Sequence, residues 1–184
     1  MAEHPKWKRL SKKTLYKGRV HIVEHSVILP NGTPSHYEVD HSEKGAVAVL
    51  ILTPENEIIL SHQYRFALDA WIYDLPGGGV GEHENVRDAA VRECQEEVGI
   101  VPRALTELIT FYPNPGRSDW SSTLFFCDDY EVTDAYQGDP SEVVEQVRIP
   151  INDLKKKIHL GEIVDPSLLI AWHTAIEKGL VVLS

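Results

Sequence analysis

Three glutamates, Glu93, Glu96 and Glu97, are spaced three and four residues apart within the segment 78–100, which reads GGVGEHENVRDAAVRECQEEVGI. On a helix this spacing puts their carboxylates on one face, where like charges repel one another. A hard cation removes the repulsion, and Mg²⁺ suits the site because it prefers a few protein carboxylates together with water and phosphate oxygens. The spacing therefore predicts a Mg²⁺ site for a phosphorylated substrate, with Mn²⁺ as an alternative ion.

The residues around the glutamates predict the element that positions them. Apolar residues at every fourth position indicate a helix over about 85–98 with one buried stripe, formed by Val86, Ala90, Cys94 and Val98. The glycine-rich stretch 78–81 favours a loop before the helix, and Gly99 suits the left-handed residue that ends it. A run of glutamates is more often a solvated helix face, but the glycines at fixed positions beside this run favour a metal site.

Arg92 lies among these acids and is predicted to orient them rather than to bind substrate. On a helix it comes within reach of Asp88 and Glu96, each four residues away, and it can also extend back to Glu84. The sequence leaves open which of these three carboxylates Arg92 contacts.

The whole segment resembles the Nudix box, G-x5-E-x7-R-E-U-x-E-E-x-G-U with U apolar, and Cys94 and Ile100 fill its apolar positions. The resemblance implies an α+β chain with the Nudix fold, in which a mixed β-sheet is sandwiched between α-helices. It also implies hydrolysis of a nucleoside diphosphate linked to another group. A divalent metal would be held by Glu93, Glu97 and often Glu96, together with the backbone carbonyl of Gly77.

Segments outside the box resemble the ADP-ribose pyrophosphatase branch of the Nudix family; they are 63–65, 71–78 and 112–119. This resemblance implies that a nucleoside diphosphate sugar, such as ADP-ribose, is cleaved to a nucleoside monophosphate and a sugar phosphate. It further implies substrate contacts from Trp71, Pro115 and Gly116. Because Asp74 and Gly77 stand where the branch usually has Glu and Ala, the prediction is kept to nucleoside diphosphate sugars in general.

Two arginines are candidates for holding the diphosphate of this substrate. Arg65 and Arg117 each offer paired guanidinium donors that match phosphate oxygens, although either could instead be an ordinary exposed arginine. Two other functions stay open: a pyrophosphatase for nucleoside triphosphates or dinucleoside polyphosphates, and a sensor that binds ADP-ribose without cleaving it. Sensors typically lack metal-binding carboxylates, which are present here.

The resemblance to the ADP-ribose branch implies that the general base comes from a loop before a late strand. The acidic residues of the segment 128–145 include Glu131, Asp139, Glu142 and Glu145. Glu142 is the preferred base because it precedes an apolar strand start, in a loop whose composition allows movement. Glu145 is the second candidate, and Glu96 is grouped with these catalytic acids.

The overall composition excludes several classes of partner. The net charge is −10, from 28 acidic and 18 basic residues, which disfavours general binding to nucleic acid or to anionic membranes. The longest apolar run, 46–52, is too short to span a bilayer, and no apolar segment follows the basic amino terminus as in a signal peptide. Cys94 and Cys127 are expected to be buried and reduced, which favours a cytoplasmic location.

The patterns divide the chain into an amino-terminal antiparallel β extension, 1–43, and a Nudix catalytic domain, 44–184. Strands at 16–29 and 36–41 are predicted to form a hairpin in the extension. In the resembling enzymes this segment makes a homodimer and places an aromatic ring on the base; the candidates here are Tyr16, Tyr37 and Trp7. The other predicted strands are 46–52, 57–64, 71–75, 105–112, 123–127 and 143–149, and the later helices are 151–158 and one that begins at Pro166 with Asp165 as cap.

Overall fold

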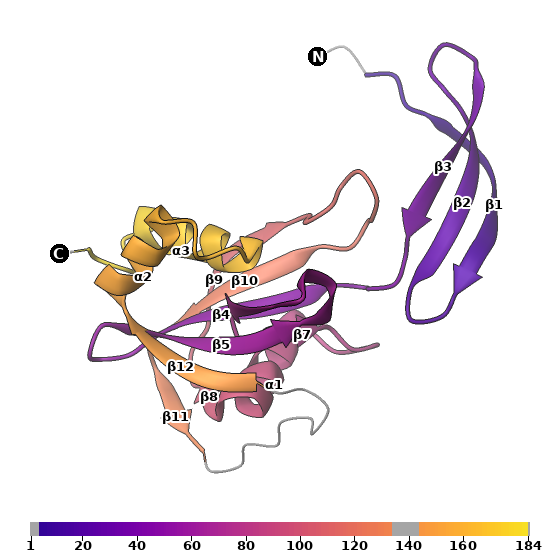
Figure 1. Cartoon of the computed structure of the whole chain (residues 1–184). Coiled ribbons are helices and arrows are strands. Elements are labelled where there is room, and N and C mark those ends of the chain that lie inside the picture. The colour runs from indigo at the N-terminus through magenta and orange to yellow at the C-terminus, as the bar shows by residue number, and fades with distance from the viewer. Residues whose placement is uncertain (1–3, 134–143, 184) are drawn as a thin grey trace. The chain divides into compact units, whose positions relative to one another are not determined.

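The computed structural model of the chain, drawn in Figure 1, describes residues 4–133 and 144–183. These residues belong to two compact units. The first unit combines residues 1–44 with the segment 112–121, and the second comprises residues 45–111 and 122–184. The first unit therefore contains three of the predicted substrate residues, Pro115, Gly116 and Arg117.

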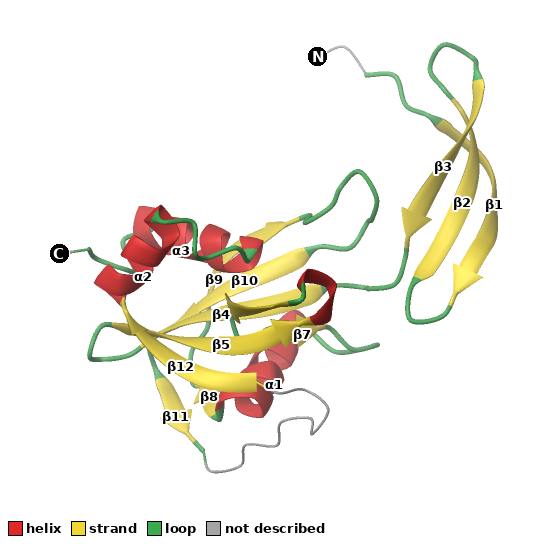
Figure 2. Cartoon of the chain, viewed as in Figure 1, coloured by secondary structure: helices red, strands yellow, loops and turns green. Residues whose placement is uncertain are grey.

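The first unit contains a three-stranded antiparallel sheet with the order β1 (Lys8–Lys17), β2 (His21–Ile28) and β3 (Pro34–Asp40) (Figure 2). The predicted antiparallel extension is thus confirmed, but the single strand predicted at 16–29 is wrong. The chain turns back between Lys17 and His21, so that β1 pairs with β2. Since every residue of β1 is exposed, its lysine-rich sequence has no alternation of buried apolar residues from which a strand could be predicted.

The second unit is built on a seven-stranded mixed sheet with the order β12-β5-β4-β10-β9, to which β6 adds beside β5 and β7 beside β4. Its strands are β4 (Ala46–Leu52), β5 (Glu57–Arg65), β6 (Ala70–Asp74), β7 (Gly77–Gly79), β9 (Thr106–Phe111), β10 (Ser122–Cys127) and β12 (Val144–Pro150). Among the strands of this unit that the structure describes, only the central pair β4 and β10 is parallel. The strands predicted for this unit are confirmed, with small shifts at their ends.

Helices cover both faces of this sheet (Figure 1). One side carries α1 (Val86–Val98), and the other carries α2 (Ile151–His159) and α3 (Pro166–Glu177). Residues on alternate sides of β4 enter two separate cores, because Val49 packs with α1 residues whereas Leu50 packs with Trp172 of α3. The predicted sandwich is confirmed. No helix in residues 4–133 and 144–183 has the length and apolar content needed to cross a membrane.

Four short elements were not predicted from the sequence. Strands β8 (Ile100–Pro102) and β11 (Tyr130–Val132) form a separate two-stranded sheet. The glycines of β7, expected to form a loop, pair with β4, and a 3-10 turn, η1 (Phe66–Leu68), links β5 to β6. Segments of three residues are too short to show a periodic pattern, so the sequence gives little indication of them.

Helix α1, which carries the acidic cluster, begins and ends as predicted. The Asn85 side chain caps it by accepting from the N–H groups of Arg87 and Asp88, and Gly99 ends it with φ of 62°. The predicted stripe is wrong at its first residue, because Val86 in the first turn is 39% exposed. Its buried residues are Ala89, Ala90, Cys94 and Val98. Both Cys94 and Cys127 are free and buried, as predicted.

We expect Gly99→Ala to lower the free energy of unfolding by about 1–2 kcal/mol, because an L residue is strained in the left-handed region. The new Cβ would also lie 3.1 Å from the carbonyl oxygen of Thr133. Gly161→Ala is a matched control, since Gly161 has φ of +74° but no atom within 4 Å of a built Cβ. Urea unfolding followed by circular dichroism should show the larger loss for Gly99→Ala, and equal losses would contradict the role of the Thr133 contact.

Candidate active site

Glu97 fixes helix α1 to the sheet through hydrogen bonds to two different strands. Its Oε2 accepts from the N–H of Gly77 in β7 at 3.1 Å and from Ser61 Oγ in β5 at 3.0 Å. Burial of the carboxylate raises the pKa of Glu97 to about 7. The two hydrogen bonds therefore offset the cost of burying the charged carboxylate only in part. A nearby positive charge would stabilise the carboxylate further.

Glu93 lies one turn earlier on α1 and approaches the same glycine strand. Its side chain is 12% exposed, and burial raises its pKa, against the opposing effect of Arg92. A Cβ built on Gly78 would lie 2.6 Å from Glu93 Oε1. Any larger residue at position 78 would displace this carboxylate, which gives a physical reason for glycine at the first position of the box.

Arg92 connects four groups of the cluster. Its Nε donates to Glu84 Oε1 at 2.9 Å, and its Nη2 donates to the carbonyl oxygen of Gly79 at 3.0 Å. Its Nη1 donates to Glu93 Oε1 at 2.7 Å and to Glu96 Oε2 at 3.0 Å. Arg92 thus orients the acids, as predicted, and pairs with both Glu84 and Glu96.

Glu84 closes the glycine-rich loop onto α1. The second carboxylate oxygen, Oε2, accepts from the N–H of Gly81 at 2.8 Å as well as from Arg92. The hydrogen bond from Arg92 lowers the pKa of Glu84. Asp88, the remaining candidate partner of Arg92, instead accepts from the side chain of its neighbour Asn85. The loop and the helix are therefore joined by a charged pair that keeps Glu84 ionised.

The carboxylate oxygens around β7 suit a hard divalent cation, although they are not arranged as a complete coordination site. Among the residues that the structure describes, no group of three or more His, Cys, Asp or Glu side chains is arranged to hold a metal ion. However, Glu93 and Glu97 are half-buried carboxylates with raised pKa values, and Glu96 adds a third carboxylate that is 45% exposed. Oxygen donors with uncompensated charge, one of them open to solvent, are the set that Mg²⁺ prefers. Gly77, the predicted carbonyl ligand, lies beside Glu97.

Arg65, at the end of β5, is held by an ion pair with Asp74 of β6. Asp74 is only 7% exposed, and its Oδ2 also accepts from Gln63 Nε2 at 3.4 Å. The Arg65 side chain nevertheless keeps 47% of its surface exposed. Because one carboxylate anchors it and solvent still reaches it, Arg65 suits the predicted contact with phosphate oxygens.

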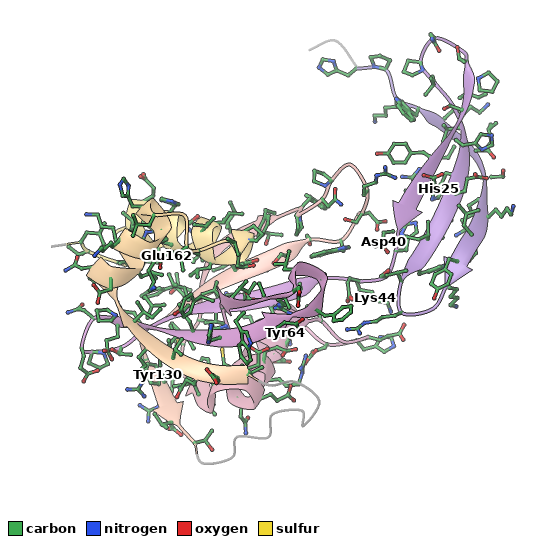
Figure 3. All side chains as sticks on the ribbon, viewed as in Figure 1. His25, Asp40, Lys44, Tyr64, Tyr130 and Glu162 are labelled. Atoms are coloured by element: carbon green, nitrogen blue, oxygen red, sulfur yellow. The ribbon has the colours of Figure 1, made fainter. Side chains whose placement is uncertain are left out.

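Two further predicted residues of the second unit meet at His62. Trp71 of β6 pairs with Tyr64 of β5, labelled in Figure 3, and its ring centroid is 5.2 Å from that of His62. Glu145 of β12 is exposed and pairs with His62, whose Nδ1 lies 3.3 Å from the Glu145 carboxylate. Glu142, the preferred general base, lies outside the described residues. No spacing pattern predicts that His62 contacts either candidate.

The first unit contains a cavity of about 380 Å³. Its lining includes Trp7, Arg9, His25, Tyr37, His41, Pro115, Arg117 and Asp119. The rings of Trp7 and Tyr37 meet edge to face with their centroids 5.5 Å apart, and the Tyr37 hydroxyl donates to the carbonyl oxygen of Gly116. The segment 112–121 is therefore fixed to β3, and its predicted substrate residues lie at an aromatic and cationic cavity.

The histidines of this cavity were not predicted as site residues. His25, labelled in Figure 3, is buried on β2, and its Nε2 makes no hydrogen bond. Desolvation lowers the pKa of His25. His41 Nδ1 lies 3.1 Å from the carboxylate of Asp119, an interaction between residues far apart in sequence. Their spacing resembles no ligand motif, so only the folded structure brings them together.

Comparison with known proteins identifies the family. The model of the NUDIX domain matches residues 43–168. The chain belongs to the Nudix family. The ADP-ribose pyrophosphatase of Bacillus subtilis (strain 168) is 32% identical over 160 residues, which cover 86% of each chain. The methanol dehydrogenase activator of Bacillus methanolicus is 31% identical over 166 residues, 89% of each chain.

The fold is likewise that of a solved Nudix-type structure. The crystal structure of an ADP compounds hydrolase superposes with a TM-score of 0.80 over 98% of each chain, at 23% sequence identity. The predicted family, its ADP-ribose pyrophosphatase branch and the α+β fold class are confirmed. The protein is accordingly a hydrolase of phosphorus-containing anhydrides.

We expect Glu97→Gln to remove part of the pH dependence of stability in the metal-free protein. Because burial raises the Glu97 pKa from 4.5 to about 7, the folded state keeps a proton that the unfolded state has lost over this range. The proton on Glu97 therefore contributes to the free energy of unfolding. This stabilisation is complete below about pH 4.5 and is lost as the pH rises through about 7. The Tm should therefore fall less steeply with rising pH in the Gln variant.

A second measurement, in which Mg²⁺ is added to both proteins, serves as the control. At pH 8, added Mg²⁺ should raise the Tm of the wild-type protein, whose Glu97 is ionised, and should raise that of the Gln variant less. Parallel curves of Tm against pH for the two proteins would show that Glu97 ionises as readily in the folded state as in the unfolded state.

Proposed function

We propose that the protein hydrolyses the diphosphate bond of a nucleoside diphosphate sugar, ADP-ribose or a related compound, in a Mg²⁺-dependent reaction. The products are a nucleoside monophosphate and a sugar phosphate. The observation that carries this proposal is the pair of half-buried carboxylates, Glu93 and Glu97, which lie against the glycine strand β7 and have raised pKa values. The similarity to an ADP-ribose pyrophosphatase over 86% of the chain supports the choice of substrate.

Glu93, Glu96, Glu97 and the carbonyl oxygen of Gly77 would hold the metal. A bound Mg²⁺ would supply positive charge to balance the diphosphate and to make the attacking water more acidic. The protein contributes the placement of these ligands, since Arg92 contacts both Glu93 and Glu96. Arg92 thereby prevents Glu93 and Glu96 from moving apart when no cation balances their repulsion.

Each unit, taken by itself, offers candidate substrate contacts. In the second unit Arg65, anchored by Asp74, donates to the diphosphate. In the first unit the cavity lined by Trp7, Tyr37 and Arg117 suits a base and its attached sugar, because aromatic rings stack on bases and a guanidinium balances phosphate. Trp71, Pro115 and Gly116 stay predicted substrate contacts.

The cavity favours two of the three aromatic candidates for base stacking. Trp7 and Tyr37 both line it, whereas Tyr16 does not. Tyr16 instead lies over Gly18, where a built Cβ would be 2.4 Å from its hydroxyl oxygen. We therefore assign the stacking role to Trp7 or Tyr37.

We further propose that the protein is a homodimer formed through the amino-terminal sheet. Large apolar side chains of this unit are exposed in the single chain; they include Trp7, Leu10, Leu15 and Tyr16. Exposed apolar groups concentrated on one element favour association. The buried free cysteines are consistent with the proposed cytoplasmic location.

A substrate panel tests the proposed function. With Mg²⁺ present we expect ADP-ribose to give AMP and ribose 5-phosphate, faster than GDP-mannose, UDP-glucose, ATP or diadenosine polyphosphates, with products separated by ion-exchange chromatography. Removing the metal with EDTA should stop the reaction, and adding Mg²⁺ back should restore it. Glu97→Gln should lower kcat by about two orders of magnitude or more, because it removes a metal ligand.

The panel also separates the alternative functions. Preferred cleavage of ATP or of a dinucleoside polyphosphate would replace the proposal with a different pyrophosphatase. Tight binding of ADP-ribose without cleavage would indicate a sensor. Glu107→Gln, on an exposed residue of β9, is a matched control that should leave kcat unchanged.

The general base is tested by comparing Glu142→Gln with Glu145→Gln. We expect Glu142→Gln to lower kcat by about 10²-fold or more, because a base contributes about that factor to proton removal from water. Glu145→Gln should have a smaller effect, since Glu145 is exposed and pairs with His62. The reverse order of kcat values, measured with saturating substrate and Mg²⁺, would assign the base to Glu145.

A further inference from the structure

One polar side chain interrupts the buried apolar face of β2. Val23, His25 and Val27 alternate along this strand, and all three are buried. A histidine in such a row is usually a core residue whose ring nitrogens are hydrogen-bonded. Within the part of the chain that the structure describes, however, the buried Nε2 of His25 has no hydrogen-bond partner. Because an unpaired buried polar atom is destabilising, its presence indicates a partner from outside the chain.

The neighbours of His25 are engaged elsewhere. The ring of His41 meets that of His25 edge to face with centroids 5.8 Å apart, but His41 Nδ1 lies 3.1 Å from the carboxylate of Asp119. Tyr37 pairs with His25 across β2 and β3, but its hydroxyl donates to the carbonyl oxygen of Gly116. The folded chain thus brings polar groups close to His25 without satisfying its Nε2.

His25 is also a wall residue of the cavity in the first unit. The cavity has a volume of about 380 Å³, which lies within the range of about 300–1,000 Å³ that is usual for small-molecule sites. Its apolar lining includes Val27, Val39 and Pro115. A mainly apolar wall with a few polar groups is the usual form of a ligand site. His25 therefore offers an unsatisfied hydrogen-bonding group where a ligand has room to bind.

The strand pairing places His25 beside a ring that suits base stacking. Because His25 and Tyr37 are direct partners in the β2–β3 ladder, their side chains lie on the same face, with Cβ atoms about 4.5–5.5 Å apart. The ring of Trp7 meets that of Tyr37 edge to face. A base stacked on either ring would turn its polar edge, rather than its face, toward the residues that flank the ring. His25 is in a position to contact that edge.

The charge state of His25 suits a neutral polar group better than a phosphate. Desolvation, followed by the charge of Arg9, lowers the pKa of His25, so its ring is neutral at pH 7. A neutral imidazole has one N–H donor and one acceptor nitrogen, which match the donors and acceptors on the edges of bases. Arg9 and Arg117, which also line the cavity, carry the positive charge that a phosphate requires.

We propose that His25 is a specificity-determining residue, whose Nε2 forms a hydrogen bond with the polar edge of the substrate base in this cavity. The inference rests on the proposed function, because it takes the nucleoside of the substrate as the ligand of the cavity. A base with a matching group completes the hydrogen bonding of His25, whereas a base without one leaves the nitrogen unpaired. This difference makes the protein discriminate among bases.

The test uses four substrates that differ only in the base: ADP-glucose, GDP-glucose, UDP-glucose and CDP-glucose. We expect the wild-type protein to prefer one of them, with the preference measured as a ratio of kcat/KM values. His25→Leu, which removes the polar atoms, should reduce this ratio about tenfold. His25→Gln should keep most of the preference, because its amide offers both a donor and an acceptor.

His21→Leu is the matched control. His21 lies on the same strand, and among the described residues its buried Nε2 also has no partner, but His21 does not line the cavity. Its replacement should therefore leave the base preference unchanged. Thermal unfolding of the free proteins separates recognition from folding. His25→Leu should not lower the Tm, because it removes an unpaired polar atom, whereas loss of a hydrogen-bonded core histidine would lower it.

The outcomes distinguish this inference from the proposed function. An unchanged preference in His25→Leu, or an equal loss in His21→Leu, overturns the role of His25 while the hydrolase stands. Equal cleavage of all four substrates by the wild-type protein also overturns it. A lowered Tm in His25→Leu, together with loss of the preference in His25→Gln, would assign His25 a structural role instead.

Binding measurements keep the test independent of turnover. If none of the four substrates is cleaved, the Kd values of AMP, GMP, UMP and CMP, measured by calorimetry, replace kcat/KM in the same comparison of variants. If no compound of the substrate panel is cleaved either, the proposed function fails by itself. An equal affinity of the wild-type protein for the four mononucleotides would then overturn the role of His25.

Discussion

The attachment of the Glu97 carboxylate to the N–H of Gly77 and to Ser61 is the interaction on which the site depends. It joins α1 to two strands that pair with the same neighbour, β4, and it does so with a charged group inside the protein. A half-buried carboxylate with neutral donors keeps a raised pKa, so the fold is built around a group that a cation would stabilise. Metal binding at Glu97 would therefore be linked to folding through one side chain.

Arg92 offsets part of the negative charge of the acidic cluster. By donating to Glu84, Glu93 and Glu96, it offsets repulsion among the acids and fixes the glycine loop through the carbonyl oxygen of Gly79. One guanidinium does not balance all the carboxylates of the cluster, and the pKa values of Glu93 and Glu97 stay raised. The cluster is thus held together without being neutralised, and a divalent cation would supply the missing positive charge.

Features with a local cause could be predicted from the sequence, and features made by distant contacts could not. The helix α1, its cap at Gly99 and the core position of Trp172 follow from periodicity and turn chemistry. Strand β1 was missed because all its residues are exposed, and Val86 was misassigned because the first turn of α1 extends beyond the core. The hydrogen bond from the Tyr37 hydroxyl to the carbonyl oxygen of Gly116 joins residues far apart in the chain, and no pattern of spacing encodes it.

The two acidic clusters differ in how their charge is balanced. In the first, one arginine, Arg92, contacts several carboxylates, and Glu96 among them is open to solvent, so a hydrated cation can supply the missing charge. In the second, Arg65 pairs with the buried carboxylate of Asp74 and balances its charge. Because Ser61 donates to Glu97 and pairs with Asp74 across the β5–β6 ladder, β5 holds both acids in fixed register.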